Sequence, residues 1–122
     1  MKIKLSSRIL FSALILAFFV HNIEEAVSIC SFPVQSPVAF IQPVSCIQFI
    51  WAVSFLSVVA LAVFITAMKT KNLKVYNFVS TGLSAVFLLN ALIPHLIVGL
   101  YTLSYTPGLL SAVLLNLPLS IL

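Results

Sequence analysis

The sequence predicts an all-α protein that is embedded in a membrane as a transmembrane bundle of about four helices. Of its 122 residues, 62% are hydrophobic and 7% are charged, whereas soluble domains are about half apolar and about a quarter charged. The mean hydropathy of +1.26 points the same way. Several apolar runs approach the roughly 20 residues that a helix needs to cross a bilayer. We therefore expect one integral-membrane helical domain over residues 1–122.

The first apolar run is expected to form a helix over about residues 7–28. It begins as ILFSALILAFFV after a basic start and continues through HNIEEAV. A basic start also opens signal peptides, but no small-residue cleavage site follows here, because that region holds His21, Glu24 and Glu25. We expect this run to be retained as a transmembrane helix.

Three further helices are expected at residues 47–68, 76–103 and 107–122. Three prolines interrupt the preceding stretch, residues 29–46, which therefore reads as a loop. The run at 76–103 would be about 42 Å long if fully helical, so it must tilt, kink or protrude. The last run starts on Pro107, which suits a helix start, and is barely long enough to span.

The positions of the basic residues predict the orientation. All six lysines and arginines lie in residues 2–8 or 69–74. With four spans, both stretches face the same side, which the positive-inside rule identifies as the cytoplasm. We therefore expect cytoplasmic termini, outer loops at 29–46 and 104–106, and a location in the plasma membrane of a bacterium. The basic residues are not interleaved with aromatic residues, so we expect no nucleic-acid binding.

Both acidic residues of the chain lie beside one of its two histidines, in HNIEE. On a helix, His21, Glu24 and Glu25 project from one face. Carboxylates are disfavoured near a helix C-terminus, and a charge at the bilayer centre costs about 2.5 to 3.5 kcal/mol on insertion scales. Either the helix simply ends in water here or the three residues form a specific polar centre. The second interpretation is favoured, because intramembrane ionisable groups are generally functional.

The other histidine, His95, is expected in the same outer half of the membrane. Pro94 has no N–H, so it predicts a kink and a free carbonyl at Asn90. We expect an imidazole nitrogen of His95 within about 7 Å of a carboxylate of the first helix, close enough to share an ion or a water. Asn116 in the last run is expected to bond to another helix.

Three stretches of the chain carry a resemblance to a known family. These are HNIEE, NALIPH and YTPGLLSAVLLNLPLS, in that order. Together they resemble the HXXEE family of small, uncharacterised integral membrane proteins, although the interval from Asn90 to His95 is longer here than in that family. The resemblance supports Asn90, Pro94, His95 and Asn116 as members of the polar centre, and it implies no activity.

The residue types of this centre suit a metal. Imidazole and carboxylate groups bind Zn²⁺ or iron, so His21, Glu25 and His95 are candidate ligands that leave one position open. Glu24, Glu25 and His21 are then candidate catalytic residues, with the spare glutamate as a general base on water. The expected substrate is a hydrophobic or lipid-like small molecule, hydrolysed or isomerised at the centre.

Two alternatives need no metal. The cluster is also suited to moving protons or binding a small substrate, and a transporter of this size would have to form a homodimer to enclose a path. Alternatively, a His–Glu hydrogen bond simply locks two helices together. Such bonds contribute about 0.6 kcal/mol in membranes, which is less than the insertion cost of the acids.

The only two cysteines, Cys30 and Cys46, both fall at the expected outer loop. In an oxidising compartment they would pair, and otherwise they would remain free, buried thiols. The chain has only three glycines and no glycine-rich phosphate loop, so nucleotide binding is not expected.

Overall fold

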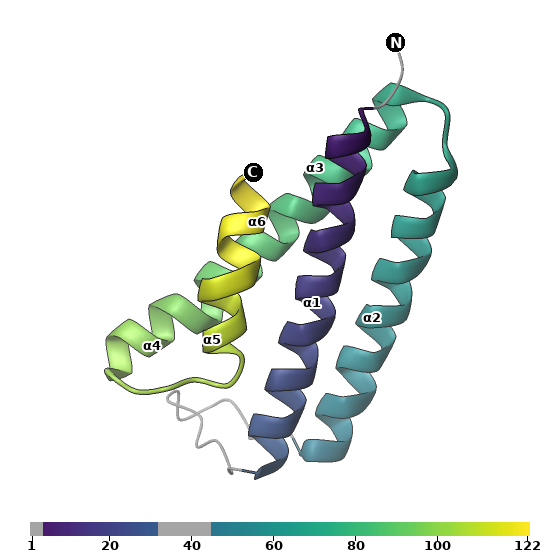
Figure 1. Cartoon of the computed structure of the whole chain (residues 1–122). Helices are drawn as coiled ribbons and strands as arrows, with labels where there is room; N and C mark the ends of the chain where they lie inside the picture. Colours follow the sequence, from purple (N-terminus) through teal and green to yellow (C-terminus); the bar gives the residue numbers. More distant parts are fainter. Residues whose placement is uncertain (1–3, 32–44) are drawn as a thin grey trace.

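The computed structural model describes residues 4–31 and 45–122, and the described chain is helical without strands (Figure 1). The all-α prediction is therefore confirmed. The elements in chain order are α1 (Leu5–Ser31), α2 (Cys46–Lys69), α3 (Leu73–Asn90), the π-helical turn η1 (Ala91–Leu96), α4 (Ile97–Thr102), α5 (Leu109–Ser111), the π-helical turn η2 (Ala112–Asn116) and α6 (Leu117–Ile121).

Three of the described helices are long and apolar enough to cross a membrane. They are α1, α2 and the stretch Leu73–Thr102, which joins α3 to α4. The last apolar helix, Leu109–Ile121, is shorter. At 1.5 Å per residue it measures about 20 Å, against about 30 Å for a hydrocarbon core. The fourth expected helix is therefore present, but it is shorter than residues 107–122 and shorter than a full crossing.

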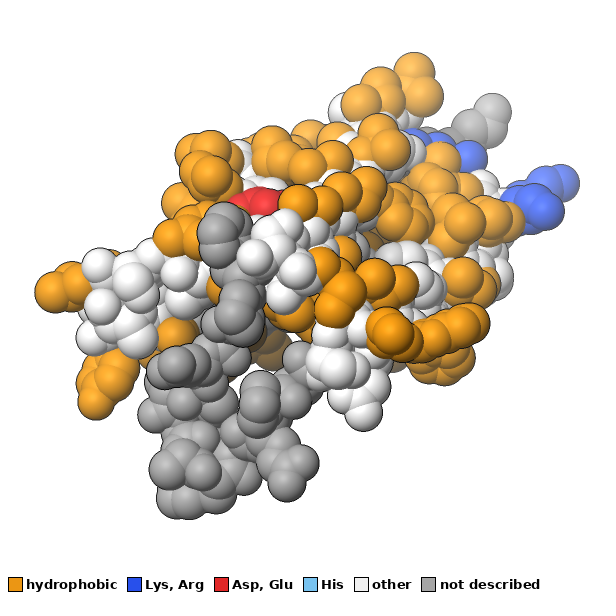
Figure 2. All heavy atoms as spheres, turned by 90° about the horizontal axis from the view of Figure 1, so that it is seen from below, with side chains coloured by type: hydrophobic (Ala, Val, Ile, Leu, Met, Phe, Trp, Pro, Cys, Tyr) orange, Lys and Arg blue, Asp and Glu red, His pale blue; other side chains and the backbone are white. Residues whose placement is uncertain are grey.

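The central helix is α1, which lies between α2 and the last helix, with α3 behind it (Figure 1). Its buried face carries large apolar side chains, and Phe18 stacks on Phe87 of α3 with ring centroids 4.2 Å apart. In contrast, α2 buries only Ala60 and Ala67. Its large apolar side chains are mostly exposed, as they are over much of the molecule (Figure 2). This surface suits lipid contact, and α1 is the helix best placed to hold a buried polar centre.

The described basic residues gather at one end of the bundle (Figure 2). Arg8 at the start of α1 donates to the carbonyl of Met68 near the end of α2. Asn72 then caps α3, because its side chain accepts from the backbone N–H groups of Lys74 and Val75. The acidic residues of α1 lie farther along the chain, toward the opposite end of the helix.

The predicted kink at Pro94 is confirmed. The Ile93–Pro94 peptide bond is cis, and Ile93 leaves the helical conformation with φ −128° and ψ 116°. As a result α4 departs from the line of α3 (Figure 1). The chain then reverses through left-handed residues at Leu103 and Gly108 and returns as the last helix. This reversal brings the start of α5 against α1 and η1.

A disulfide joins Cys30 at the end of α1 to Cys46 at the start of α2, with Cα atoms 4.9 Å apart. The paired alternative from the sequence is therefore the one that the structure contains. The bond ties the end of α1 to the start of α2. The residues between 32 and 44 lie outside the described part of the chain.

We expect the disulfide to stabilise the fold measurably. Replacing both Cys30 and Cys46 with serine should lower the free energy of unfolding by about 3 kcal/mol, as the chain-entropy model gives for a closed loop of about this length. Thermal unfolding in detergent, with and without reductant, checks this. Reductant should destabilise the parent protein and leave the double variant unchanged, and equal stability of the two proteins would contradict the prediction.

Candidate metal centre

Three ionisable side chains meet in the interior: His21 and Glu25 from α1, and His95 from η1. One ligand atom of each lies within 4.8 Å of the other two. Glu25 Oε1 is 3.2 Å from His95 Nε2, and Glu25 Oε2 is 3.8 Å from His21 Nε2. The two imidazole rings meet edge to face with centroids 4.6 Å apart. The expected approach of His95 to a carboxylate of the first helix is therefore confirmed, and the carboxylate is that of Glu25.

The centre is buried but not sealed. His21 is fully buried, His95 is 2% exposed and the Glu25 side chain is 15% exposed. Figure 2 shows acidic side-chain atoms at the surface with hydrophobic side chains around them. Glu24 and Glu25 are the only acidic residues of the chain, so the patch lies at the HXXEE stretch of α1, beside the centre.

A hydrogen-bond chain fixes the orientation and the tautomer of His21. Its Nδ1 lies 3.0 Å from Ser111 Oγ, and that hydroxyl donates to the carbonyl of Gly108 at 3.3 Å. The hydroxyl must therefore accept from His21, which places the ring proton on Nδ1 and leaves a lone pair on Nε2. Asn90 donates to this Nε2 from its amide nitrogen at 3.0 Å. The contact between Nδ1 and Ser111 is typical of metal-binding histidines, in which the ring nitrogen that does not bind the metal makes a hydrogen bond.

His95 has no comparable hydrogen bonds. Neither ring nitrogen makes a hydrogen bond of good geometry to a described residue. Nε2 lies 3.2 Å from Glu25 Oε1, and the ring is also close to the backbone carbonyl of Pro107. Only its backbone is anchored, through a hydrogen bond that the Thr106 hydroxyl donates to the His95 carbonyl at 3.2 Å. A buried polar group without a partner costs about 1 to 3 kcal/mol. A bound cation would remove this penalty.

The adjacent acid, Glu24, has different neighbours. Its carboxylate accepts from the backbone N–H of Ser111 at 2.8 Å and of Leu110 at 3.2 Å, and from the Tyr105 hydroxyl. Partial burial and this hydrogen bond raise the pKa of Tyr105, in keeping with the phenol being the donor. Glu24 thus binds the N-terminus of the last helix, where a negative charge is stabilising. These contacts do not favour the general-base role expected for it, since both of its oxygens are engaged.

Gly108 is part of the centre, and the sequence did not single it out. It has φ +80°, and a Cβ atom at this position would lie 2.5 Å from Glu25 Cγ, 2.7 Å from His21 Cε1 and 3.1 Å from His95 Cε1. The backbone of Gly108 therefore packs directly on all three candidate ligands. The turn-forming Pro-Gly pair was the available signal, but it gave no indication of which residues the turn would touch.

Asn116 is also buried, at 0% exposure in η2. Neither atom of its amide has a hydrogen-bond partner in the described part of the chain. The expected bond from Asn116 to another helix is therefore not found. Pro94 acts on the centre through the backbone, because the kink at Ile93 and Pro94 sets the direction of the chain directly before His95.

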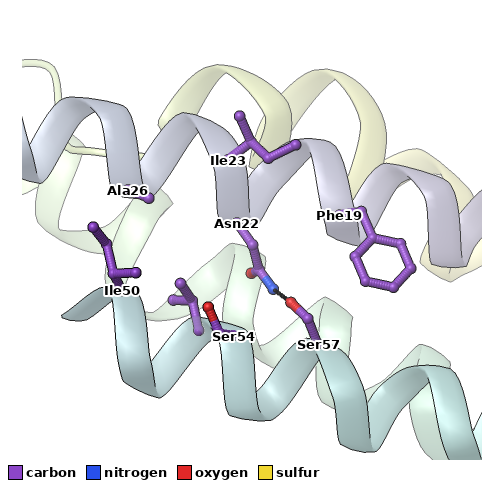
Figure 3. A pocket seen from close by; sticks show the side chains of 8 residues that line it. Phe19, Asn22, Ile23, Ala26, Ile50, Ser54 and Ser57 are labelled. Atoms are coloured by element: carbon purple, nitrogen blue, oxygen red, sulfur yellow. Dashed lines mark hydrogen bonds between the residues drawn. The ribbon is translucent and has the colours of Figure 1, made fainter. Parts of the chain in front are cut away.

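A separate groove of about 350 Å³ lies between α1 and α2 (Figure 3). Asn22 donates to Ser57 across it at 2.8 Å, and Phe19, Ile23 and Ala26 complete the α1 side. At about 100° per residue, the mean direction of these positions around α1 lies about 130° from that of His21 and Glu25. The groove is therefore separate from the metal centre.

The chain is similar to proteins of unknown function. The chain is 31% identical over 104 residues to the uncharacterised protein YrkK of Bacillus subtilis (strain 168), an alignment that covers 85% of this chain and 65% of that protein. The chain thus spans a little less than two thirds of its relative. No solved structure matches it. The profile of the family described as a protein of unknown function with HXXEE motif matches residues 12–122. The chain belongs to this HXXEE-motif family, whose defining residues here are His21, Glu24 and Glu25.

Proposed function

We propose that this protein binds a divalent transition metal through His21, Glu25 and His95 and uses it on a lipid-like substrate. The observation that carries the proposal is the convergence of three ligand atoms within 4.8 Å from two separate elements. The fixed tautomer of His21 and the unpartnered nitrogens of His95 support it. Two imidazoles and one carboxylate are the donor set of several catalytic zinc sites and of non-haem iron sites.

A lipid-like substrate follows from the surroundings of the centre. Figure 2 shows hydrophobic side chains around the acidic surface atoms, and Leu110 of α5, whose backbone N–H donates to Glu24, has an exposed side chain. A substrate that reaches Glu25 thus passes an apolar rim before meeting polar groups. We place this rim in the outer half of the membrane, with cytoplasmic termini, on the strength of the basic residues at the opposite end.

The chemistry proposed for the metal is that of a Lewis acid, which polarises an oxygen of the substrate for hydrolysis or isomerisation. The protein supplies three ligands and leaves a coordination position for the substrate. His21 is held by Ser111, and His95 is held by the kink and by the contact of its carbonyl with Thr106. Burial of both imidazoles excludes most water from the ligands.

A second candidate function is a metal-free proton or small-substrate site. It is favoured by the contacts of Glu25, which lies between two imidazoles at hydrogen-bonding or ion-pair distances. The carboxylate therefore has two imidazoles within reach with which to share or exchange a proton. As a transporter, such a protein would work as a homodimer. Metal analysis distinguishes this candidate from the first.

The full chain, purified in mild detergent, is expected to contain or take up one equivalent of Zn²⁺ or Fe²⁺. His95→Ala should weaken metal binding by more than about 100-fold, because losing a ligand costs more than losing an outer-shell partner. Asn22→Ala is the matched control, since this buried polar residue faces α2, and it should bind metal like the parent. Elemental analysis and competition with a chromophoric chelator measure both.

Two results would contradict the metal centre. One is a parent protein that takes up no metal from either salt, and the other is a His95→Ala variant that binds as tightly as the parent. In the first case, a histidine titration that shifts in Glu25→Gln would support the metal-free site. A loss of thermal stability alone would leave the cluster as a contact between helices.

A further inference from the structure

The side chain of Asn90 contacts the centre, and the proposed function does not use it. It comes from the last residue of α3, one turn before His95. Its amide nitrogen lies 3.0 Å from Nε2 of His21, the atom that would bind a metal. Because Nδ1 of His21 carries the proton shared with Ser111, Nε2 accepts this hydrogen bond with its only lone pair.

We propose that Asn90 competes with the metal for His21 and thereby sets the metal affinity of the site. This inference rests on the proposed function. A lone pair cannot accept from an amide and coordinate a cation together, so metal binding must break the Asn90 contact. Asn90 thus holds the His21 ring in its metal-binding orientation while no metal is bound. A metal can bind only after the hydrogen bond between Asn90 and His21 breaks.

The local structure allows that release without a change of fold. The backbone at Asn90 is regular helix, with φ −62° and ψ −40°, and the side chain is only part-buried. A side-chain rotation is therefore sufficient to free Nε2. The displaced amide remains beside the centre, where its N–H groups are available to an oxygen of the substrate. Asn90 is a positioning residue in the metal-free protein.

This role predicts that removing Asn90 changes the metal affinity in the direction opposite to the usual one. Removing a residue around a metal site normally weakens binding, by about 10- to 100-fold for an outer-shell partner. Removing Asn90 should instead tighten binding, by about 3- to 10-fold, which corresponds to the net value of one hydrogen bond. Ser111→Ala is the matched comparison, because Ser111 holds the other nitrogen of the same ring. Its loss should weaken binding by about 10-fold or more.

The experiment is a Zn²⁺ titration of the full chain against a chromophoric chelator, with the parent, Asn90→Ala, Asn90→Leu and Ser111→Ala. Asn90→Leu keeps the branching and the number of heavy atoms of the side chain, so it provides the answer if the alanine variant unfolds. Tighter Zn²⁺ binding in either Asn90 variant, together with weaker binding in Ser111→Ala, is the expected result. The double variant His21→Ala/Asn90→Ala should lose the gain, because the competition acts only through His21.

The outcomes separate this inference from the proposed function. A parent protein that binds Zn²⁺, with Asn90 variants that bind equally or more weakly, overturns the competition and leaves the metal centre intact. A gain that persists without His21 also overturns it. A parent protein that binds no Zn²⁺ overturns both proposals together.

Discussion

Replacing Gly108 with alanine is expected to disrupt both the fold and the candidate metal centre. The new methyl group would lie 2.5 Å from Glu25 Cγ and 2.7 Å from His21 Cε1, distances that real Cβ atoms do not adopt. It would also force an L side chain into φ +80°. Backbone strain and overpacking each cost about 1 to 3 kcal/mol, so the free energy of unfolding should fall by about 2 to 5 kcal/mol.

The effect should be large because the steric clash cannot be relieved without breaking other contacts. Moving the turn away from α1 would separate Ser111 from both His21 and Glu24, because Gly108 and Ser111 lie in the same helical turn. Moving the ligands would open the distances between His21, Glu25 and His95. Metal affinity should therefore fall with stability, by more than about 100-fold, as expected for a disturbed ligand set.

Gly82→Ala provides the matched control for this prediction. A Cβ atom at Gly82 meets nothing within 4 Å, and the residue lies inside α3. Alanine is a better helix former than glycine, so this variant should be unchanged or more stable by up to about 1 kcal/mol. Thermal unfolding and Zn²⁺ titration of both variants test the pair. A Gly108→Ala protein with the parent's melting temperature and Zn²⁺ affinity would show that the turn does not pack on the ligands as described.

The helices could be predicted because their determinants are local. Apolar run length identified α1 and α2 to within a few residues, and the missing N–H of Pro94 identified the kink. The last helix was less predictable. Its sequence is apolar enough for a membrane segment, but the chain reversal at Gly108 and its side-by-side packing with α1 set where the helix begins.

The candidate site was predictable only where one helix or one kink determines it. The spacing of His21 and Glu25 places both on one face of α1, and Pro94 drew attention to His95. In contrast, the roles of Ser111, Asn90 and the Gly108 backbone depend on how the last helix and α3 dock on α1. No local pattern encodes these contacts. The sequence also could not separate the two glutamates, since adjacent residues differ by only about 100° around the helix axis.

The different contacts of Glu24 and Glu25 lead to the second prediction with a large effect. We expect Glu25→Gln to weaken Zn²⁺ binding by more than about 100-fold, since Glu25 is the only carboxylate among the three candidate ligands. Its stability should change little, because Glu25 makes no hydrogen bond to the backbone of another helix among the described contacts.

Glu24→Gln should give the opposite profile, although the two substitutions are chemically identical and adjacent in sequence. The carboxylate of Glu24 accepts from two backbone N–H groups of the last helix and from Tyr105. An amide loses the charge and one acceptor, so the free energy of unfolding should fall by about 1 to 3 kcal/mol. Zn²⁺ affinity should fall by about 10-fold at most, through the effect on Ser111, which orients His21. Thermal unfolding and Zn²⁺ titration of both variants provide the measurement. If Glu24→Gln loses Zn²⁺ as completely as Glu25→Gln while the fold stays intact, Glu24 belongs among the ligands and the division of roles within the HXXEE motif is wrong.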